Sequence, residues 1–526
     1  MRHTAVRRGA RGSAARRAAL LIALSLAAPA AAAAQAPVTD TIAEARRLDD
    51  SRSFGAAEAL LRSYLRNHPD NGDAASLLAH TLYWLRRPAE ARVVYEAALL
   101  RHPEDITLRL DYGRMLMDTN DRDRARELLA PMSGSRESRG RAEALLGTLY
   151  YWGGDYTTAV RLFRDALRAD SSQREARRQL AEILTLTAPW ARIATALRHD
   201  DQTLDRIGGD VQAGWYATPL LALSARVRPM QFRLGDTVTR TLTLAELGFS
   251  DFAPSARLET EMSAGMLQRS YGSSSDWVGR LVLGFRLPQQ LTLRVRAERE
   301  PYLYTLASLS TPVMTQTLAT TLDLNGPRGW LGQAAAQSER YPDANSVTTG
   351  YAWLLAPLLY GPSGELQVGY SVSAQNASQS RFELAQTSQP FAPGDPRYST
   401  LGVYAPYYTP SNLFAQSVLA AFALRSSSGT EFRASGAFGV RATDDAPGFQ
   451  VVSVASPPST TVERTFQRRV FTPWNVRGSL AATLSEGWRL DIAGEYAHTA
   501  FYTAVTTSVQ LTYRFVAAAK RRAERY

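Results

Sequence analysis

The segment T-A-V-T-T-S-V-Q-L-T-Y-R-F, residues 503–515, alternates between apolar and polar side chains. Its apolar residues occupy positions 505, 509, 511, 513 and 515, and its polar residues occupy the even positions from 506 to 514. A β-strand directs successive side chains to opposite faces, so this segment forms a strand with one apolar and one polar face. The segments that precede it decide what kind of sheet the strand joins.

Similar alternation recurs from residue 210 onward, in segments separated by Gly, Pro, Asn, Asp and Ser. The clearest segments are 256–268, 277–287, 291–299, 364–375, 412–425, 430–442, 474–484 and 488–498. Weaker candidates are 210–217, 220–233, 237–249, 314–324, 329–340, 346–356 and 398–405. Together with the last strand, these segments make about 16 predicted strands.

The connections between these segments alternate in length. Short ones lie near 287–289, 325–327, 426–429 and 486–487, and long ones lie at 300–313, 376–397 and 443–472. Short turns at one end and long loops at the other are typical of bacterial outer-membrane barrels. We therefore predict an antiparallel transmembrane β-barrel of about 16 strands over residues 210–516, with a basic tail at 517–526.

The amino terminus has the parts of a secretory signal peptide. A basic segment precedes an apolar run at residues 18–28, and small residues follow up to Ala34. We predict a signal peptide at 1–34. Its arginines contribute strongly to the formal net charge of +11, and the charges of the helical region form no one-sided basic stripe. Nucleic acid is therefore not an expected partner.

Residues 38–187 repeat with a period of 34. Small residues recur in two registers, Ala57, Ala91, Ala125 and Ala159 in one and Ala45, Ala79, Gly113 and Gly147 in the other. Such residues are needed where the two helices of a hairpin cross closely, and the pattern resembles tetratricopeptide repeats. We predict a multidomain chain in which this α-solenoid precedes the barrel. Pro131 should end one helix early, and a linker is predicted at 188–209.

Catalytic and metal-binding patterns are missing from the sequence. There is no cysteine, and the six histidines have no metal-ligand spacing. No nucleophile elbow, phosphate-binding loop or dinucleotide-binding motif occurs. We therefore predict that the protein is not an enzyme and has no cofactor or metal site.

Charged residues recur on the polar parity of the predicted strands. They are Arg257, Glu259, Glu261, Arg280, Arg286, Arg294, Arg296, Glu298, Glu431, Arg433, Arg489, Asp491, Glu495 and Arg514. An arginine on the lipid side costs about 2–4 kcal/mol near the bilayer midplane, so these residues should face the lumen. They could form ion pairs that rigidify the wall, or hydrogen-bond a polar solute, and both roles are compatible.

The order of signal peptide, repeats and barrel resembles bacterial outer-membrane proteins with periplasmic tetratricopeptide repeats. The cellulose-synthase outer-membrane subunit and the poly-N-acetylglucosamine export porin are of this type. The segment Y-A-P-Y-Y-T-P-S-N-L-F, residues 404–414, resembles the tyrosine- and proline-rich start of a strand in the cellulose-type barrel. The repeat array is much shorter than in that subunit, and no de-acetylase-like segment is present.

This resemblance implies an outer-membrane pore for polysaccharide export. The barrel would contact outer-membrane lipid, its lumen would hold the polysaccharide chain, and the repeats would dock partner proteins in the periplasm. A barrel for protein or surface-lipoprotein translocation is one alternative, because surface-lipoprotein assembly modulators share the architecture. A general diffusion porin with a scaffold domain is another.

Overall fold

The computed structural model describes residues 38–517, apart from 202, 236–237, 272–274, 362, 386–388, 456–457 and 500–501. The predicted signal peptide and nearly all of the predicted basic tail lie outside the described residues. The chain divides into two compact units between Met115 and Leu116.

The described part of the first unit consists of helices from the repeats. They are α1 Val38–Asp50, α2 Phe54–Asn67, α3 Gly72–Trp84, α4 Pro88–Arg101 and most of α5 Ile106–Asp118. Asn71 caps α3, since its side chain accepts a 2.9 Å hydrogen bond from the backbone N–H of Ala74. Ala45, Ala57, Ala79 and Ala91 are completely buried, and Gly113 is buried as well.

The second unit continues the repeats before the barrel begins. Its helices are α6 Arg122–Leu129, α7 Arg139–Gly153, α8 Tyr156–Ala169 and α9 Arg174–Leu186. A 3₁₀ helix, Ala130–Gly134, contains Pro131 and follows the short α6 as predicted. Ala125, Ala159 and Gly147 are buried. None of the helices described has the length and apolarity to cross a membrane.

Gly147 explains why the repeat needs a small residue at this register. A Cβ atom added there would lie 2.5 Å from Cε1 of Phe163, which is completely buried. Glycine therefore lets α7 approach the aromatic ring on α8. The matched helical position Gly153 has no atom within 4 Å of such a Cβ.

We expect Gly147→Ala to lower the stability of the helical region, by roughly 1–3 kcal/mol, because the core would be overpacked. Gly153→Ala should be neutral or stabilising, since alanine favours the helix and meets nothing. Thermal melts at 222 nm of the full chain in detergent measure both. Equal melting temperatures for the two variants would contradict the packing explanation.

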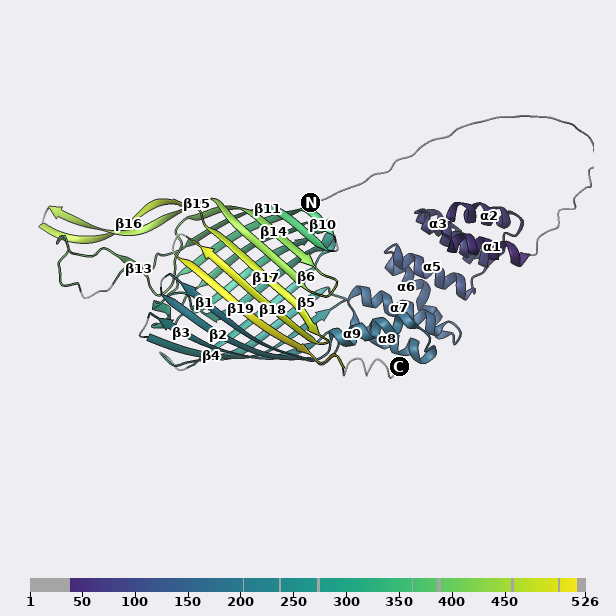
Figure 1. Cartoon of the computed structure of the whole chain (residues 1–526), viewed down its shortest axis with the longest axis horizontal. Coiled ribbons are helices and arrows are strands. Elements are labelled where there is room, and N and C mark those ends of the chain that lie inside the picture. Colours follow the sequence, from purple (N-terminus) through teal and green to yellow (C-terminus); the bar gives the residue numbers. More distant parts are fainter. Residues whose placement is uncertain are drawn as a thin grey trace, which may run out of the picture. The chain divides into compact units, whose positions relative to one another are not determined.

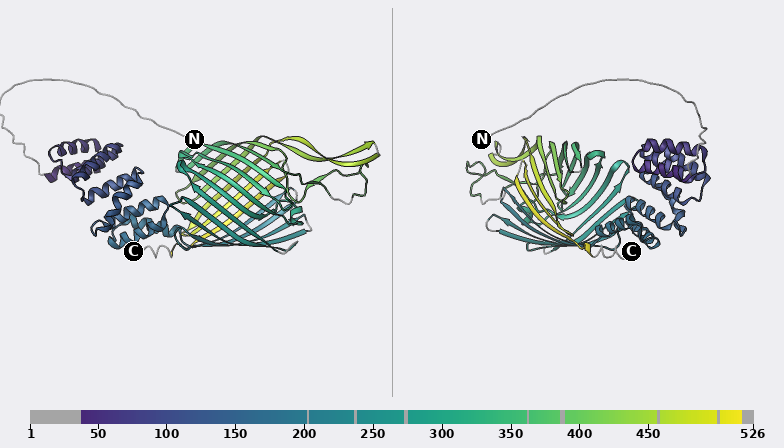
Figure 2. Two further views of the ribbon diagram at one scale, coloured as in Figure 1. Left: turned by 180° about the vertical axis from the view of Figure 1, so that it is seen from behind. Right: turned by 45° about the vertical axis from the view of Figure 1, so that its right-hand side comes forward.

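The rest of the second unit is a closed antiparallel barrel (Figures 1 and 2). Its strands are β1 Trp190–Asp200, β2 Leu204–Tyr216, β3 Ala222–Leu234, β4 Val238–Ala253, β5 Leu258–Arg269, β6 Ser275–Arg286, β7 Leu291–Pro301, β8 Met314–Asn325, β9 Leu331–Arg340, β10 Ser346–Gly361, β11 Gly364–Ala377, β14 Leu413–Arg425, β15 Glu431–Ala455, β17 Trp474–Ser485, β18 Trp488–His498 and β19 Thr503–Arg514. Each strand pairs with the next, and β19 pairs with β1 to close the ring. Within the described residues the barrel therefore has 16 strands.

The predicted linker at 188–209 is wrong, because β1 occupies half of it and β2 begins at Leu204. The inner positions Ala194 and Ala196 are small and not polar, so the alternation of β1 is weak in the sequence. Pairing with β2 and β19 over the whole strand stabilises β1 instead. The barrel thus starts directly after α9.

Two predictions in the long loops are also wrong. Segment 398–405 is not a barrel strand: only β13 Gly402–Tyr404 forms, and it pairs with β12 Phe382–Leu384 in a separate small sheet. Segment 443–472 is not an open loop, because the second half of β15 pairs with β16 Pro458–Phe471. This hairpin projects from the barrel in Figure 1. The predicted strand count was right because the missed β1 and the false strand offset each other.

The two ends of the barrel differ. At the short-turn end, compact connections such as Ser426–Thr430 join neighbouring strands, and the chain enters there from α9. At the long-loop end lie residues 302–313, residues 378–412 and the β15–β16 hairpin. The predicted long connections therefore all lie at one end of the barrel, and short turns such as 341–345 join strands at that end as well.

Candidate functional site: the inner wall of the barrel

The outer face of the barrel carries large apolar side chains that remain exposed. Leu318, Val418 and Val509, for example, are 58%, 47% and 44% exposed. Others from most of the remaining strands are Ile193, Ile207, Val227, Leu247, Met262, Leu281, Leu354, Val372, Phe438, Leu480 and Ile492. Soluble monomers rarely expose so large an apolar surface, and lipid-facing barrel surfaces require it. The barrel thus has the surface of an outer-membrane barrel.

The predicted polar-face residues lie on the opposite parity, toward the lumen. Strand register places Glu259 beside Gly284, Gly284 beside Arg294, and Arg294 beside Thr321, in one row around the wall. The residues with this inner parity are Glu259, Glu261, Arg280, Arg286, Arg294, Arg296, Glu298, Glu431, Arg433, Arg489, Asp491, Glu495 and Arg514. Arg257 lies in the turn before β5.

Several of these charges form ion pairs along the wall. Arg286 lies 2.6 Å from Glu259, Arg296 lies 2.8 Å from Glu298, and Arg294 contacts Asp323. Arg514 donates to the backbone carbonyl oxygen of Leu186 at the end of α9. These contacts support the wall-rigidifying role, although pairs that water reaches contribute little individually.

Further charged residues line the inner wall on β2, β3 and β4, and these were not predicted from the sequence. Arg226 donates to Asp210 at 3.1 Å, and Arg228 donates to Glu246 at 2.9 Å. In the sequence, the charged Arg226 and Arg228 already alternate with the apolar Val227. These strands alternate weakly elsewhere, which is why their inner faces were not assigned.

We expect the double variant Arg294→Glu and Arg296→Glu to shift the ion selectivity of the pore toward cations. Two positive side chains of the wall would become negative, which reverses the local field that a solute meets. Reversal potentials in a KCl gradient measure this shift. The matched control, Arg464→Glu with Arg468→Glu on β16, should leave selectivity unchanged. An unchanged reversal potential in a variant that still assembles would contradict the assignment of these side chains to the lumen.

One arc of the inner wall differs from the rest because its described inner positions are uncharged. The arc lies on β10, β11 and β14. It begins beyond Glu365 and Arg425, which lie near the short-turn end of β11 and β14, and extends to the long-loop end. A cavity of about 390 Å³ lies there, with Tyr351, Trp353, Ser371, Ser373, Ser435 and Asn475 among its lining residues. Tyr351 donates a 2.8 Å hydrogen bond to Gln333. This uncharged arc combines aromatic faces with hydroxyl and amide groups.

The lumen narrows at the long-loop end because loop 302–313 folds inside the barrel. Leu309 of this loop is completely buried in a cluster with Phe232 and Leu267. Both of those side chains have inner parity, on β3 and β5. The loop therefore fills part of the lumen beside β2 to β6.

A second segment, residues 404–411, binds the first loop. The backbone N–H of Tyr408 donates to the hydroxyl of Tyr302 at 3.2 Å, and Thr305 donates to the carbonyl oxygen of Pro406. Tyr407 is 1% exposed and stacks on Tyr341 with ring centroids 3.6 Å apart. The two segments thus form one plug at the long-loop end.

Asp343 links this plug to a neighbouring loop. Tyr407 donates to its carboxylate at 2.7 Å, and Arg381 donates at 2.6 Å. Burial alone would raise the pKa of Asp343, but the hydrogen bonds from Tyr407 and Arg381 outweigh burial and lower it. Burial raises the pKa of Tyr407, whose hydroxyl stays a donor. The ionised carboxylate therefore stabilises the plug.

The comparison with known protein families bears on the helical region of the chain. The tetratricopeptide repeat family model matches residues 50–106 and 85–149. No curated protein shows significant sequence similarity. The repeats are thus of the tetratricopeptide type, and the chain combines them with a 16-stranded barrel in the part described. Repeats of this type generally mediate protein interactions.

Three solved structures illustrate the similarities. A bacterial polysaccharide outer membrane secretin has a TM-score of 0.45 and 10% identity, over 62% of this chain and 99% of its own. CdiB from Acinetobacter baumannii has a TM-score of 0.35 and 12% identity, over 62% and 60%. PilF of Pseudomonas aeruginosa has a TM-score of 0.26 and 22% identity, over 28% and 67%.

Proposed function

We propose that this chain is an outer-membrane pore through which a polysaccharide leaves the cell. The uncharged arc of the inner wall carries this proposal. Trp353 and Tyr351 offer aromatic faces on which the apolar face of a sugar ring can stack, and Ser371 and Ser373 offer hydroxyl groups beside them. A hydroxylated chain can move along such a wall without desolvating fixed charges.

The same proposal places the short-turn end in the periplasm. Short turns face the periplasm in bacterial outer-membrane barrels, and long loops face outward. Because α9 leads into β1 at the short-turn end, the repeats would lie in the periplasm and dock partner proteins there. The proposal assigns the chain a transport role and no catalytic activity.

We expect neutral linear oligosaccharides to block ion current through the reconstituted protein. Trp353→Ala should weaken this block about five- to tenfold, which corresponds to roughly 1 kcal/mol of lost stacking. Trp474→Ala, a tryptophan on the outer face, is the control and should leave the block unchanged. A block that is insensitive to Trp353→Ala, or no block at all, would contradict the proposal.

A general diffusion porin is the second candidate. The ion pairs of Arg286, Arg294 and Arg296 and the inward-folded loop 302–313 favour it, because charged constrictions select small solutes. This function predicts a steady, ion-selective conductance that oligosaccharides leave unaffected. The same current measurements therefore separate the two candidates.

A further inference from the structure

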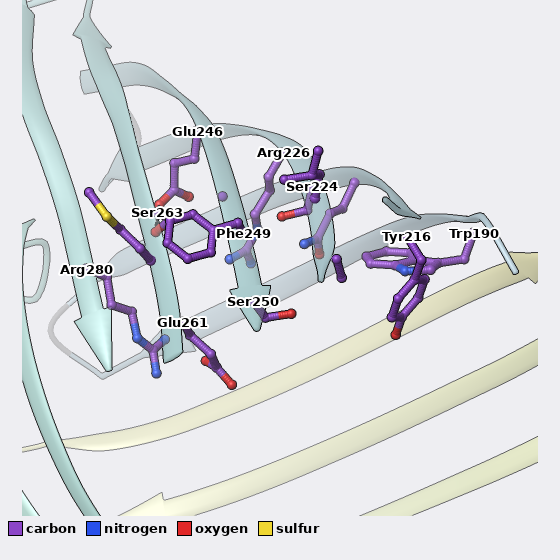
Figure 3. A pocket seen from close by; sticks show the side chains of 15 residues that line it. Trp190, Tyr216, Ser224, Arg226, Glu246, Phe249, Ser250, Glu261, Ser263 and Arg280 are labelled. Atoms are coloured by element: carbon purple, nitrogen blue, oxygen red, sulfur yellow. Dashed lines mark hydrogen bonds between the residues drawn. The ribbon is translucent and has the colours of Figure 1, made fainter. Parts of the chain in front are cut away.

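A second cavity, of about 290 Å³, lies in the inner wall toward the short-turn end (Figure 3). Its lining includes Trp190, Tyr216, Ser224, Ser250, Glu261 and Arg280, from β1 to β6. The uncharged arc lies on other strands, β10 to β14, so the two cavities are separate sites. Its volume is close to the lower bound of about 300 Å³ for small-molecule pockets.

The indole ring of Trp190 packs flat against the neighbouring strand in this cavity. A Cβ atom on its cross-strand neighbour Gly214 would lie 2.5 Å from Cε2 of the indole, so the ring rests directly over the glycine backbone. The guanidinium of Arg192 lies 5.6 Å from the ring centroid. Tyr216 lies beside the indole in Figure 3. Trp190 is only half-buried, so part of its ring can accept a ligand.

Two charged groups of the cavity are available for a ligand. Arg226 is paired with Asp210, and Glu246 is paired with Arg228. By contrast, Glu261 and Arg280 are exposed and form no hydrogen bond or ion pair with the residues described. Glu261 is paired in register with Val282 and Ser263 with Arg280, so the two charges lie diagonally on neighbouring strands. Figure 3 shows both side chains extending in the same direction.

The chemistry of these groups matches adjacent sugar hydroxyls. An ionised carboxylate only accepts hydrogen bonds and a guanidinium only donates them, whereas a hydroxyl does both. Two neighbouring hydroxyls can therefore satisfy Glu261 and Arg280 together. Arg226, Arg280, Glu246 and Glu261 are the charged residues of the lining, and their formal charges cancel. The cavity thus offers no net attraction to an acidic or a basic sugar.

We propose that this cavity binds a short stretch of a neutral polysaccharide, with one pyranose stacked on Trp190 and another, further along the chain, held at neighbouring hydroxyls by Glu261 and Arg280. Trp190 and Arg280 lie in one register row, five strand spacings or about 24 Å apart along the wall, so a single sugar cannot reach both. The inference rests on the proposed function and adds the sugar class and the place at which the chain is first held. Because the cavity lies toward the short-turn end, it would receive the polymer before the uncharged arc does.

Isothermal titration of the full chain in detergent micelles tests the inference. The probes are neutral hexasaccharides of glucose, galactose and mannose, with hexamers of glucosamine and galacturonate as the charged comparison. We expect a neutral hexamer to bind more tightly than either charged hexamer. Trp190→Ala and Glu261→Gln should each weaken its binding at least several-fold, and Trp190→Phe should retain most of it.

The control variant is Glu298→Gln, which alters an inner-wall glutamate that is already paired with Arg296. It should bind like the unaltered protein, and heat-modifiability on gels shows that each variant still forms a barrel. Binding that survives Trp190→Ala but is lost in Trp353→Ala would overturn this site and leave the export function standing. Tighter binding of a charged hexamer would overturn the neutral class. If no neutral hexamer binds, the site is absent, and current block at the uncharged arc then decides the export function separately.

Discussion

Deleting residues 304–311 should raise the single-channel conductance of the barrel several-fold. This segment carries Leu309, which is completely buried against inner-wall side chains such as Phe232. Removing it leaves β7 and β8 intact and takes away one of the contacts of segment 404–411, the hydrogen bond from Thr305 to Pro406. Conductance in planar bilayers measures the effect.

The β15–β16 hairpin supplies the control for this deletion. Residues 442–455 pair with β16 and lie beyond the part of β15 that pairs with β17. Shortening the hairpin by removing 450–463 should therefore leave conductance unchanged. If both deletions conduct like the intact protein, the plug does not limit the current.

The pH dependence of the plug follows from Asp343. Its folded-state pKa is lowered, so its stabilising contribution is present above the ordinary aspartate pKa of about 3.9 and is lost as pH falls through the lowered value. Asp343→Asn removes the ionised carboxylate at neutral pH. We expect this variant to conduct more than the unaltered protein at pH 7, and the difference to shrink at acidic pH. A difference that grows on acidification would have the wrong sign.

The second large effect concerns the lipid-facing surface. Leu281→Arg combined with Leu318→Arg should prevent the folded barrel from accumulating in the outer membrane. Each arginine costs about 2–4 kcal/mol near the bilayer midplane, and two of them approach the total stability of many proteins, about 5–15 kcal/mol. Both leucines lie on outer-face positions of barrel strands and are exposed.

Inner-wall substitutions of the same kind are the matched comparison. Ser371→Arg with Ser373→Arg adds the same charge on β11, where the side chains face the lumen and can remain hydrated. This variant should assemble. Heat-modifiable mobility of the outer-membrane fraction on gels shows the folded barrel, because a closed barrel satisfies its backbone hydrogen bonds internally. Equal assembly of both variants would mean that the assigned faces are wrong.

The sequence by itself determined the two faces of most strands and the spacing of the repeats. Period-two alternation is local, so the parities of Leu281 and Arg280 were readable without any knowledge of partner strands. The 34-residue register likewise located Gly147, because the need for a small residue recurs in every repeat. The long connections likewise marked one end of the barrel, because the length of a connection can be read from the sequence without knowledge of partner strands.

Tertiary structure alone decided which segments complete the barrel and what occupies its lumen. β1 has a weak pattern of its own, and its strand is stabilised by partners at 204–216 and 503–514. The sequence around Leu309 does not predict its burial, because its partners Phe232 and Leu267 lie on β3 and β5 and come near it only when the barrel closes. Parity also could not separate Glu259, which is paired with Arg286, from Glu261, which stays available. Pairing depends on the stagger between neighbouring strands, and that stagger exists only once the ring has closed.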